Sequence, residues 1–111
     1  MKVKVRECKE ANREHQRSRR QYCHVGHKKD TICVARAFFY LPESIQVALL
    51  AHEIGHLMGG ESETSANRIA NMEFGIRIKY RDTPYGRRLE TVTERETQRL
   101  KKELKYYIDF R

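Results

Sequence analysis

The chain has 111 residues and a net charge of +8, and 34% of its residues are charged while 39% are hydrophobic. This length supports one compact core, and two independent domains would each bury too little apolar surface. We therefore predict a single domain over residues 1–111. Because no segment matches a membrane span and the first residues lack the apolar stretch of a secretory signal, we predict a cytoplasmic protein without a membrane partner.

Positive charge is concentrated at both ends of the sequence. Residues 1–29 carry ten Lys or Arg against three Glu, residues 77–111 carry eleven against six acids, and residues 30–76 carry two against six. An acidic middle suits a region that holds a dication. The basic ends could contact nucleic acid or an acidic protein, although charged runs more often form a solvated surface.

The three cysteines, Cys8, Cys23 and Cys33, cannot all pair within one chain, and their spacing is not that of a compact disulfide framework. We therefore expect reduced thiols. Cys23, His24, His27 and Cys33 could hold a second metal ion, but the absence of a C-x2-C pair favours ordinary buried or surface thiols.

The first part of the sequence predicts a strand, a polar helix and a hairpin. Lys and Val alternate over residues 2–6, which indicates a short strand, and the polar run 7–20 contains neither Gly nor Pro and favours a helix. Two β-rich segments, 21–25 and 31–40, flank the turn-forming residues 26–30. This pattern is typical of a β-hairpin.

The middle of the sequence predicts two helices joined by a tight turn. Pro42 begins a predicted helix over residues 42–57, because proline and an acidic residue suit the first turn. Gly59-Gly60 marks the end of this helix. Ser62 can cap a second helix over residues 63–73.

The last part of the sequence predicts a strand, a turn and a long helix. Side chains alternate over residues 74–80, which favours a strand, with helical continuation through Phe74 as the alternative. Residues 82–86 form a turn, and a final helix over residues 87–107 is predicted from apolar side chains at near-helical spacing. These side chains are Leu89, Val92, Leu100, Leu104 and Ile108.

A polar triplet interrupts the otherwise apolar helix segment 47–57. Its only polar side chains are His52, Glu53 and His56, and burying them without partners would cost roughly 2–7 kcal/mol each. Histidines four residues apart share one helical face, so both can bind one ion, while Glu53 points toward the open side of that ion. The motif predicts zinc ligands at His52 and His56 and a general base at Glu53. Two core histidines bonded to backbone carbonyls are the alternative.

A catalytic zinc usually has three protein ligands and one water. The candidates for the third ligand are Glu61, Ser62, Glu63 and Glu73. A metzincin would use position 62, with Gly59 as its glycine, but a serine hydroxyl is a poor zinc ligand and disfavours that class. We prefer Glu63 over Glu61, because the tight turn after the first helix would return its carboxylate toward His56.

The segments 51–60, AHEIGHLMGG, and 63–70, ETSANRIA, resemble the ImmA/IrrE-type zinc peptidases and, more widely, small gluzincins. In those families H-E-x-x-H is followed by E-x-x-A-N or E-x-x-A-D. The resemblance covers about residues 31–75. It implies that His52, His56 and Glu63 bind zinc, that Glu53 is catalytic and that Asn67 supports the site.

The resemblance also implies a minimal zincin-like α+β fold. In it, a small sheet or hairpin packs on the active-site helix, followed by a short antiparallel ligand helix and a C-terminal helix. The implied activity is zinc-dependent endopeptidase cleavage of a protein substrate, such as a helix-turn-helix repressor of a phage or mobile element. Candidate oxyanion donors are Tyr80, Tyr85 and Arg87. The alternative function is a basic module, with structural zinc or none, that binds nucleic acid or an acidic protein.

Overall fold

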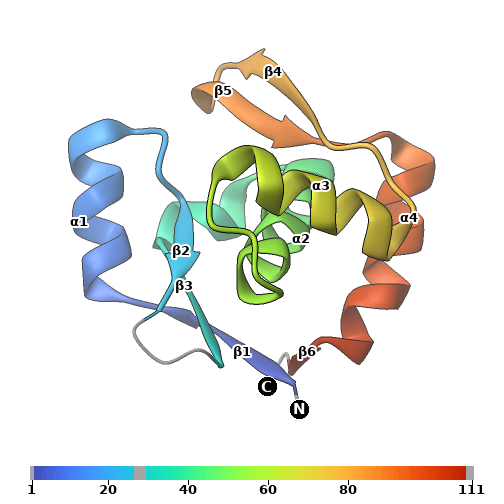
Figure 1. Cartoon of the computed structure of the whole chain (residues 1–111). Helices are drawn as coiled ribbons and strands as arrows, with labels where there is room; N and C mark the ends of the chain where they lie inside the picture. Colours follow the sequence, from blue (N-terminus) through green and yellow to red (C-terminus); the bar gives the residue numbers. More distant parts are fainter. Residues whose placement is uncertain (1, 27–29, 110–111) are drawn as a thin grey trace.

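The computed structural model describes residues 2–26 and 30–109, which form an α+β fold with two small sheets and four α-helices (Figure 1). The elements in chain order are β1 (Val3–Glu7), α1 (Lys9–Ser18), β2 (Cys23–Val25), β3 (Thr31–Val34), the 3-10 helix η1 (Arg36–Tyr40), α2 (Glu43–Leu57), α3 (Glu63–Phe74), β4 (Lys79–Thr83), β5 (Gly86–Thr91), α4 (Glu94–Glu103), the 3-10 helix η2 (Leu104–Tyr106) and β6 (Ile108–Asp109).

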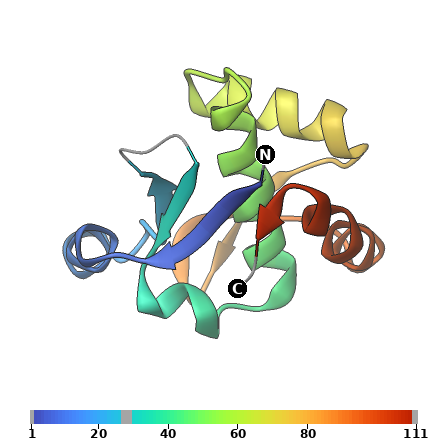
Figure 2. The ribbon, with the colours of Figure 1, turned by 90° about the horizontal axis from the view of Figure 1, so that it is seen from below.

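The larger sheet has the strand order β2-β3-β1-β6. Strand β1 runs parallel to both β3 and β6, so the first and last strands of the chain lie side by side (Figure 2). Strands β2 and β3 are antiparallel, with Cys23 opposite Val34, which confirms the predicted hairpin. Its second strand is shorter than the predicted segment 31–40, because residues 36–40 form η1. Residues 27–29 of its predicted turn lie outside the described residues.

Helix α2 lies at the centre of the molecule and contacts α3, α4, β2 and β5 (Figure 1). The predicted boundaries are confirmed, with Pro42 at the N-cap and Met58 at the C-cap. The apolar side chains of α2 join Ile32 and Val34 of the sheet in one hydrophobic core. Among residues 2–26 and 30–109, no helix combines the length and apolar character needed to cross a bilayer.

Helix α3 follows α2 after a tight turn. Ser62 caps it as predicted, through a capping box in which the Ser62 and Ser65 side chains each bond the other's backbone N–H. The helix continues through Phe74 and ends at Gly75, whose φ of 62° is left-handed. The alternative of helical continuation through Phe74 is therefore confirmed, and the predicted strand is wrong at its start, since β4 begins only at Lys79.

The predicted final helix over residues 87–107 is also wrong in its first part. Residues 86–91 form β5, which pairs with β4, and buried Leu89 reaches the core from this strand. The helix begins at Glu94, because Thr93 and Glu96 form a capping box there. The apolar residues that suggested one helix come from several elements, with Leu89 on β5, Leu100 on α4 and Ile108 on β6.

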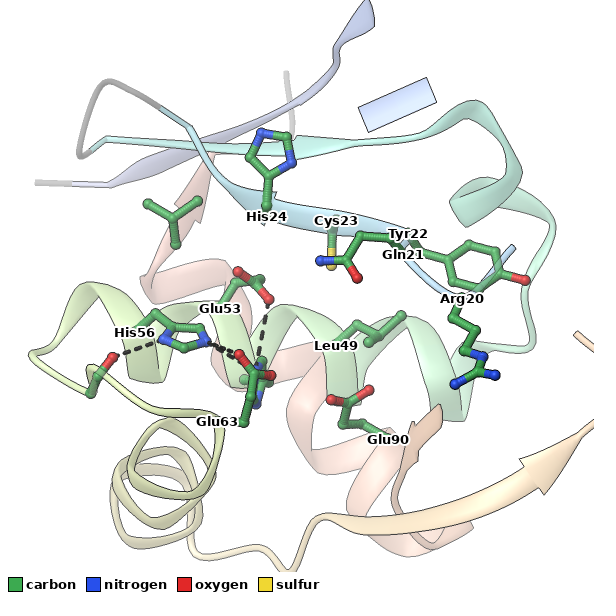
Figure 3. A pocket seen from close by; sticks show the side chains of 13 residues that line it. Arg20, Gln21, Tyr22, Cys23, His24, Leu49, Glu53, His56, Glu63 and Glu90 are labelled. Carbon is green, nitrogen blue, oxygen red and sulfur yellow. Dashed lines mark hydrogen bonds and ion pairs between the residues drawn. The ribbon is translucent and has the colours of Figure 1, made fainter. Parts of the chain in front are cut away.

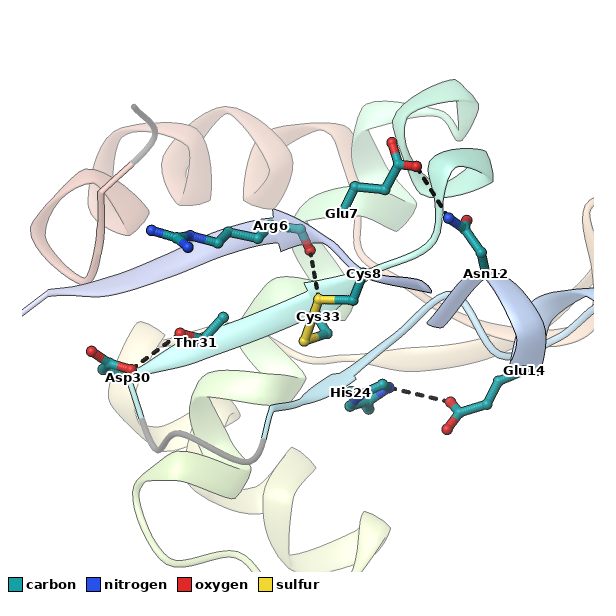
Figure 4. Close-up of a disulfide and its surroundings, with 9 residues drawn as sticks. All are labelled: Arg6, Glu7, Cys8, Asn12, Glu14, His24, Asp30, Thr31 and Cys33. Atoms are coloured by element: carbon teal, nitrogen blue, oxygen red, sulfur yellow. Dashed lines mark hydrogen bonds and ion pairs between the residues drawn. A yellow bond between two sulfur atoms is a disulfide. The ribbon is translucent and has the colours of Figure 1, made fainter. Parts of the chain in front are cut away.

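The expectation of three reduced thiols is corrected by a disulfide between Cys8 and Cys33 (Figure 4). Cys8 directly follows β1 and Cys33 lies on β3, and these neighbouring parallel strands bring the two sulfurs together. Cys23 remains a free, buried thiol. The bond joins residues 25 positions apart and ties the start of α1 to the sheet.

Thiol titration checks this pairing. In denaturant without reductant, we expect one reactive thiol per chain, that of Cys23. In the native protein that thiol should react slowly, because burial, followed by the charges of Glu53 and Glu90, raises its pKa well above the usual value. Three reactive thiols in the denatured, unreduced protein would contradict the disulfide.

Candidate metal centre

His52 and His56 lie one turn apart on α2, and their Nε2 atoms are 3.1 Å from each other. Nδ1 of His56 is 2.8 Å from the carbonyl oxygen of Gly60, which can only accept, so this nitrogen carries a hydrogen. Nδ1 of His52 is 2.6 Å from Oδ1 of Asn67 and donates to it by the same reasoning. In its neutral form, each imidazole therefore presents the lone pair of Nε2 to the same space.

Glu63, the first residue of α3, places its carboxylate against both histidines. Its Oε2 lies 2.8 Å from Nε2 of His52, and its Oε1 lies 3.2 Å from Nε2 of His56. The three candidate ligand atoms lie within 4.8 Å of one another. Two imidazole lone pairs and a carboxylate at this separation repel unless a proton or a metal ion lies between them, so this group could hold a metal ion.

Two glycines allow α3 to approach α2 closely enough for these contacts. A Cβ added at Gly55 would lie 2.8 Å from the carbonyl carbon of Ala66, and one at Gly60 would lie 2.7 Å from the Ala66 Cα. Both distances are shorter than van der Waals contact, so only glycine fits at either position. The glycine inside the H-E-I-G-H segment thus sets the distance between the histidines and the Glu63 and Asn67 side chains.

Glu53 lies beside this group and is buried by the hairpin of the larger sheet. Its Oε2 is 4.0 Å from Nε2 of His52, and its carboxylate accepts a hydrogen bond from the backbone N–H of Val25 on β2. Burial, followed by the charges of Glu63 and Glu90, raises the pKa of Glu53 to about 8. In the metal-free protein the Glu53 carboxyl therefore keeps its proton near neutral pH.

The raised pKa predicts how stability depends on pH in the metal-free protein. Between pH 4.5 and about 8, folded Glu53 retains a proton that the unfolded chain has released. Because the folded state binds more protons, its free energy of unfolding should fall with rising pH, with this group contributing up to about 1.4 kcal/mol per pH unit. Urea unfolding across this range should show a shallower fall for Glu53→Gln, and parallel curves would contradict the assignment.

A pocket of about 420 Å³ opens onto these residues (Figure 3). It is bounded by β2 and the residues before it, by α2 and by β5. Glu90 on β5 projects into it in Figure 3 and is 8% exposed. The predicted helix over residues 87–107 includes Glu90 and gives it no role in the site. Its position depends on the pairing of β4 with β5, which no local pattern in the sequence revealed.

The other predicted site residues lie elsewhere. Glu61 is exposed and does not join the cluster, and Glu73 accepts a bond from the Tyr107 hydroxyl. Tyr80, Tyr85 and Arg87, considered as oxyanion donors, do not line the pocket, and the Tyr80 hydroxyl accepts a hydrogen bond from Asn67.

The second metal site considered from the sequence does not form in the part of the chain that the structure describes. Cys33 is bonded to Cys8, and Nδ1 of His24 lies 3.2 Å from the Glu14 carboxylate. His27, the remaining candidate ligand, lies outside the described residues.

Comparisons with protein-family models, with curated proteins and with solved structures gave no significant match. The resemblance to ImmA/IrrE-type peptidases therefore stays a prediction from the sequence motif.

Proposed function

We propose that this protein is a zinc-dependent endopeptidase, with His52, His56 and Glu63 as zinc ligands and Glu53 as the general base. The observation that carries the proposal is the convergence of the Nε2 atoms of two histidines and one carboxylate beside a buried glutamate. Three ligands from two His and one Glu leave a coordination position for water, which is the arrangement of catalytic rather than structural zinc.

The residues present fit such an ion. Each candidate histidine donates its other ring nitrogen to an oxygen, which fixes the ring and directs Nε2 toward the cluster. A zinc ion held there would lower the pKa of a coordinated water and polarise a substrate carbonyl. Imidazole and carboxylate donors also suit other divalent transition metals, and zinc is the proposal because this donor set is typical of zinc peptidases.

Glu53 is placed to transfer protons in this reaction. A bound cation would lower the pKa that burial raises in the metal-free protein, and the Glu53 carboxylate could then take a proton from the attacking water and deliver it to the leaving amine. The Val25 N–H holds the carboxylate toward the histidines, so the hairpin orients the base. Glu53 thus has a role that a purely structural metal site would not need.

The pocket has features suited to a peptide substrate. Strand β2 is at the edge of the larger sheet, and residues 20–25 line the pocket alongside the histidines. An extended peptide can pair with such an edge through main-chain hydrogen bonds. We propose a protein substrate, with a helix-turn-helix repressor as the candidate that the family resemblance implies.

A cleavage assay tests the function. The protein is stripped with a chelator, reloaded with zinc and incubated with a proteome-derived peptide library, and new peptide ends are identified by mass spectrometry. We expect new ends with the zinc-loaded protein and none with the stripped protein. Equal results from both would overturn the proposal. Zinc-independent, strongly salt-dependent nucleic-acid binding in the same preparation would instead support the basic binding module.

A further inference from the structure

We propose that Tyr80 and Glu90, on the β4–β5 hairpin, are positioning residues that fix the tautomer of His52 through Asn67 and thereby set the metal affinity of the site. The inference rests on the proposed metal site. It concerns two residues outside the H-E-x-x-H and E-x-x-A-N segments, which neither touch the ion's proposed ligand atoms nor act on the substrate.

The first part of the connection is the side-chain amide of Asn67. Its Oδ1 lies 2.6 Å from Nδ1 of His52, and its Nδ2 donates to the Tyr80 hydroxyl oxygen at 2.9 Å. An amide offers one acceptor atom and one donor atom, so the group that Nδ2 contacts decides which atom faces His52. While Tyr80 accepts from Asn67, the amide oxygen faces the histidine, and Nδ1 of His52 must carry the hydrogen.

The second part is the hydrogen bond that the Tyr80 hydroxyl donates to the Glu90 carboxylate. Tyr80 and Glu90 are directly opposite each other in the antiparallel pairing of β4 with β5. A tyrosine hydroxyl has a single hydrogen. Because Glu90 takes that hydrogen, the Tyr80 oxygen is left as an acceptor, and this is the state that Asn67 requires.

Removing the acceptor at position 90 would permit the opposite arrangement. The Tyr80 hydroxyl could then donate to Oδ1 of a rotated Asn67 amide, whose Nδ2 would face His52. Nδ1 of His52 would become an acceptor and the hydrogen would move to Nε2, which could no longer bind a metal. The connected side chains therefore have two self-consistent hydrogen-bond arrangements, and only one of them leaves a lone pair on Nε2 of His52. The four side chains are those of Glu90, Tyr80, Asn67 and His52.

Burial makes this connection matter. His52 is 2% exposed, Glu90 8% and Asn67 9%, so water has little access to these three side chains, whereas Tyr80 is 39% exposed. The Tyr80 ring is held from the outside by Arg88, whose guanidinium carbon lies 5.8 Å from the ring centroid. Glu90 is not part of the cluster of candidate ligands, but its charge also acts directly on His52. The Tyr80→Phe variant keeps this charge and therefore reports only the effect carried by Tyr80 and Asn67.

The test compares Tyr80→Phe, Glu90→Leu and Glu90→Gln with the exposed control Tyr106→Phe. In each metal-free protein, long-range nitrogen–proton NMR correlations report the tautomer of His52, and competition with a chromophoric chelator gives the zinc dissociation constant. In the wild type we expect the Nδ1–H tautomer. In Tyr80→Phe and Glu90→Leu we expect mixed tautomers and zinc affinity about 10- to 100-fold weaker.

Glu90→Gln should recover most of the affinity, because its amide oxygen can still accept from Tyr80. Wild-type tautomer and affinity in both Tyr80→Phe and Glu90→Leu would overturn the proposal, as would an Nε2–H tautomer in the metal-free wild type. If Glu90→Leu fails to fold, Tyr80→Phe decides alone, since it retains the ring that Arg88 contacts. The His52 tautomer is measured without metal or substrate. A negative peptidase assay would therefore count against the proposed function and not against this proposal.

Discussion

Replacing Glu53 with glutamine should lower peptide cleavage by roughly 10²- to 10⁴-fold while leaving bound zinc unchanged, because a general acid–base contributes about that factor. Glutamine has nearly the same shape and can occupy the same buried position, but it cannot take a proton from water. Its amide oxygen can still accept the Val25 N–H bond that the carboxylate accepts. The measurement pairs the rate of cleavage of a peptide found in the library with zinc content per chain.

The matched control is Glu94→Gln, an exposed glutamate in the first turn of α4, which should cleave at the wild-type rate. Two results would contradict the role of Glu53. Wild-type cleavage by Glu53→Gln would show that another group moves the proton. Loss of zinc from this variant would place Glu53 among the ligands rather than beside them.

Replacing Gly55 with alanine should produce the largest loss of stability among conservative changes near the site. The added methyl would meet the backbone of Ala66, with its carbonyl carbon at 2.8 Å and its Cα at 3.1 Å, and backbone cannot rotate away. We expect the free energy of unfolding to fall by about 3 kcal/mol or more. Zinc affinity should also fall, because α3 carries Glu63 and Asn67 and has to move away from α2.

Gly59→Ala provides the comparison for this change. Gly59 has a left-handed φ of 114°, but no atom lies within 4 Å of an added Cβ there. Alanine is strained at this φ, so the free energy of unfolding of that variant should fall by only about 1–3 kcal/mol. Its zinc affinity should be unchanged. Equal zinc affinities of Gly55→Ala and the wild type would mean that the close approach of α2 and α3 does not position the ligands.

The parts of the structure that the sequence predicted well are those encoded locally. Helix α2 and the start of α3 follow from Pro42, Gly59-Gly60 and Ser62, which act within one or two turns. The placement of His52 and His56 together also follows from helical spacing alone. The prediction that Glu63 joins the two histidines was less local, because it required the turn between α2 and α3 to return the Glu63 carboxylate toward His56.

The parts that the sequence did not reveal depend on contacts between distant segments. The Cys8–Cys33 disulfide requires β1 to lie beside β3 in the sheet. The place of Glu90 requires β5 to pair with β4, and Leu89 and Val92 had instead suggested a helix. The Thr93-x-x-Glu96 capping box was the local pattern that could have placed the helix start correctly.

Zinc titration of the metal-free protein by calorimetry tests the central claim most directly. We predict one zinc bound per wild-type chain and no measurable binding at the same concentrations in His56→Ala, because that change removes one of the two imidazoles that converge on the cluster. A wild-type protein that takes up no zinc, or a His56→Ala variant that binds it as tightly as the wild type, would contradict this account of the site.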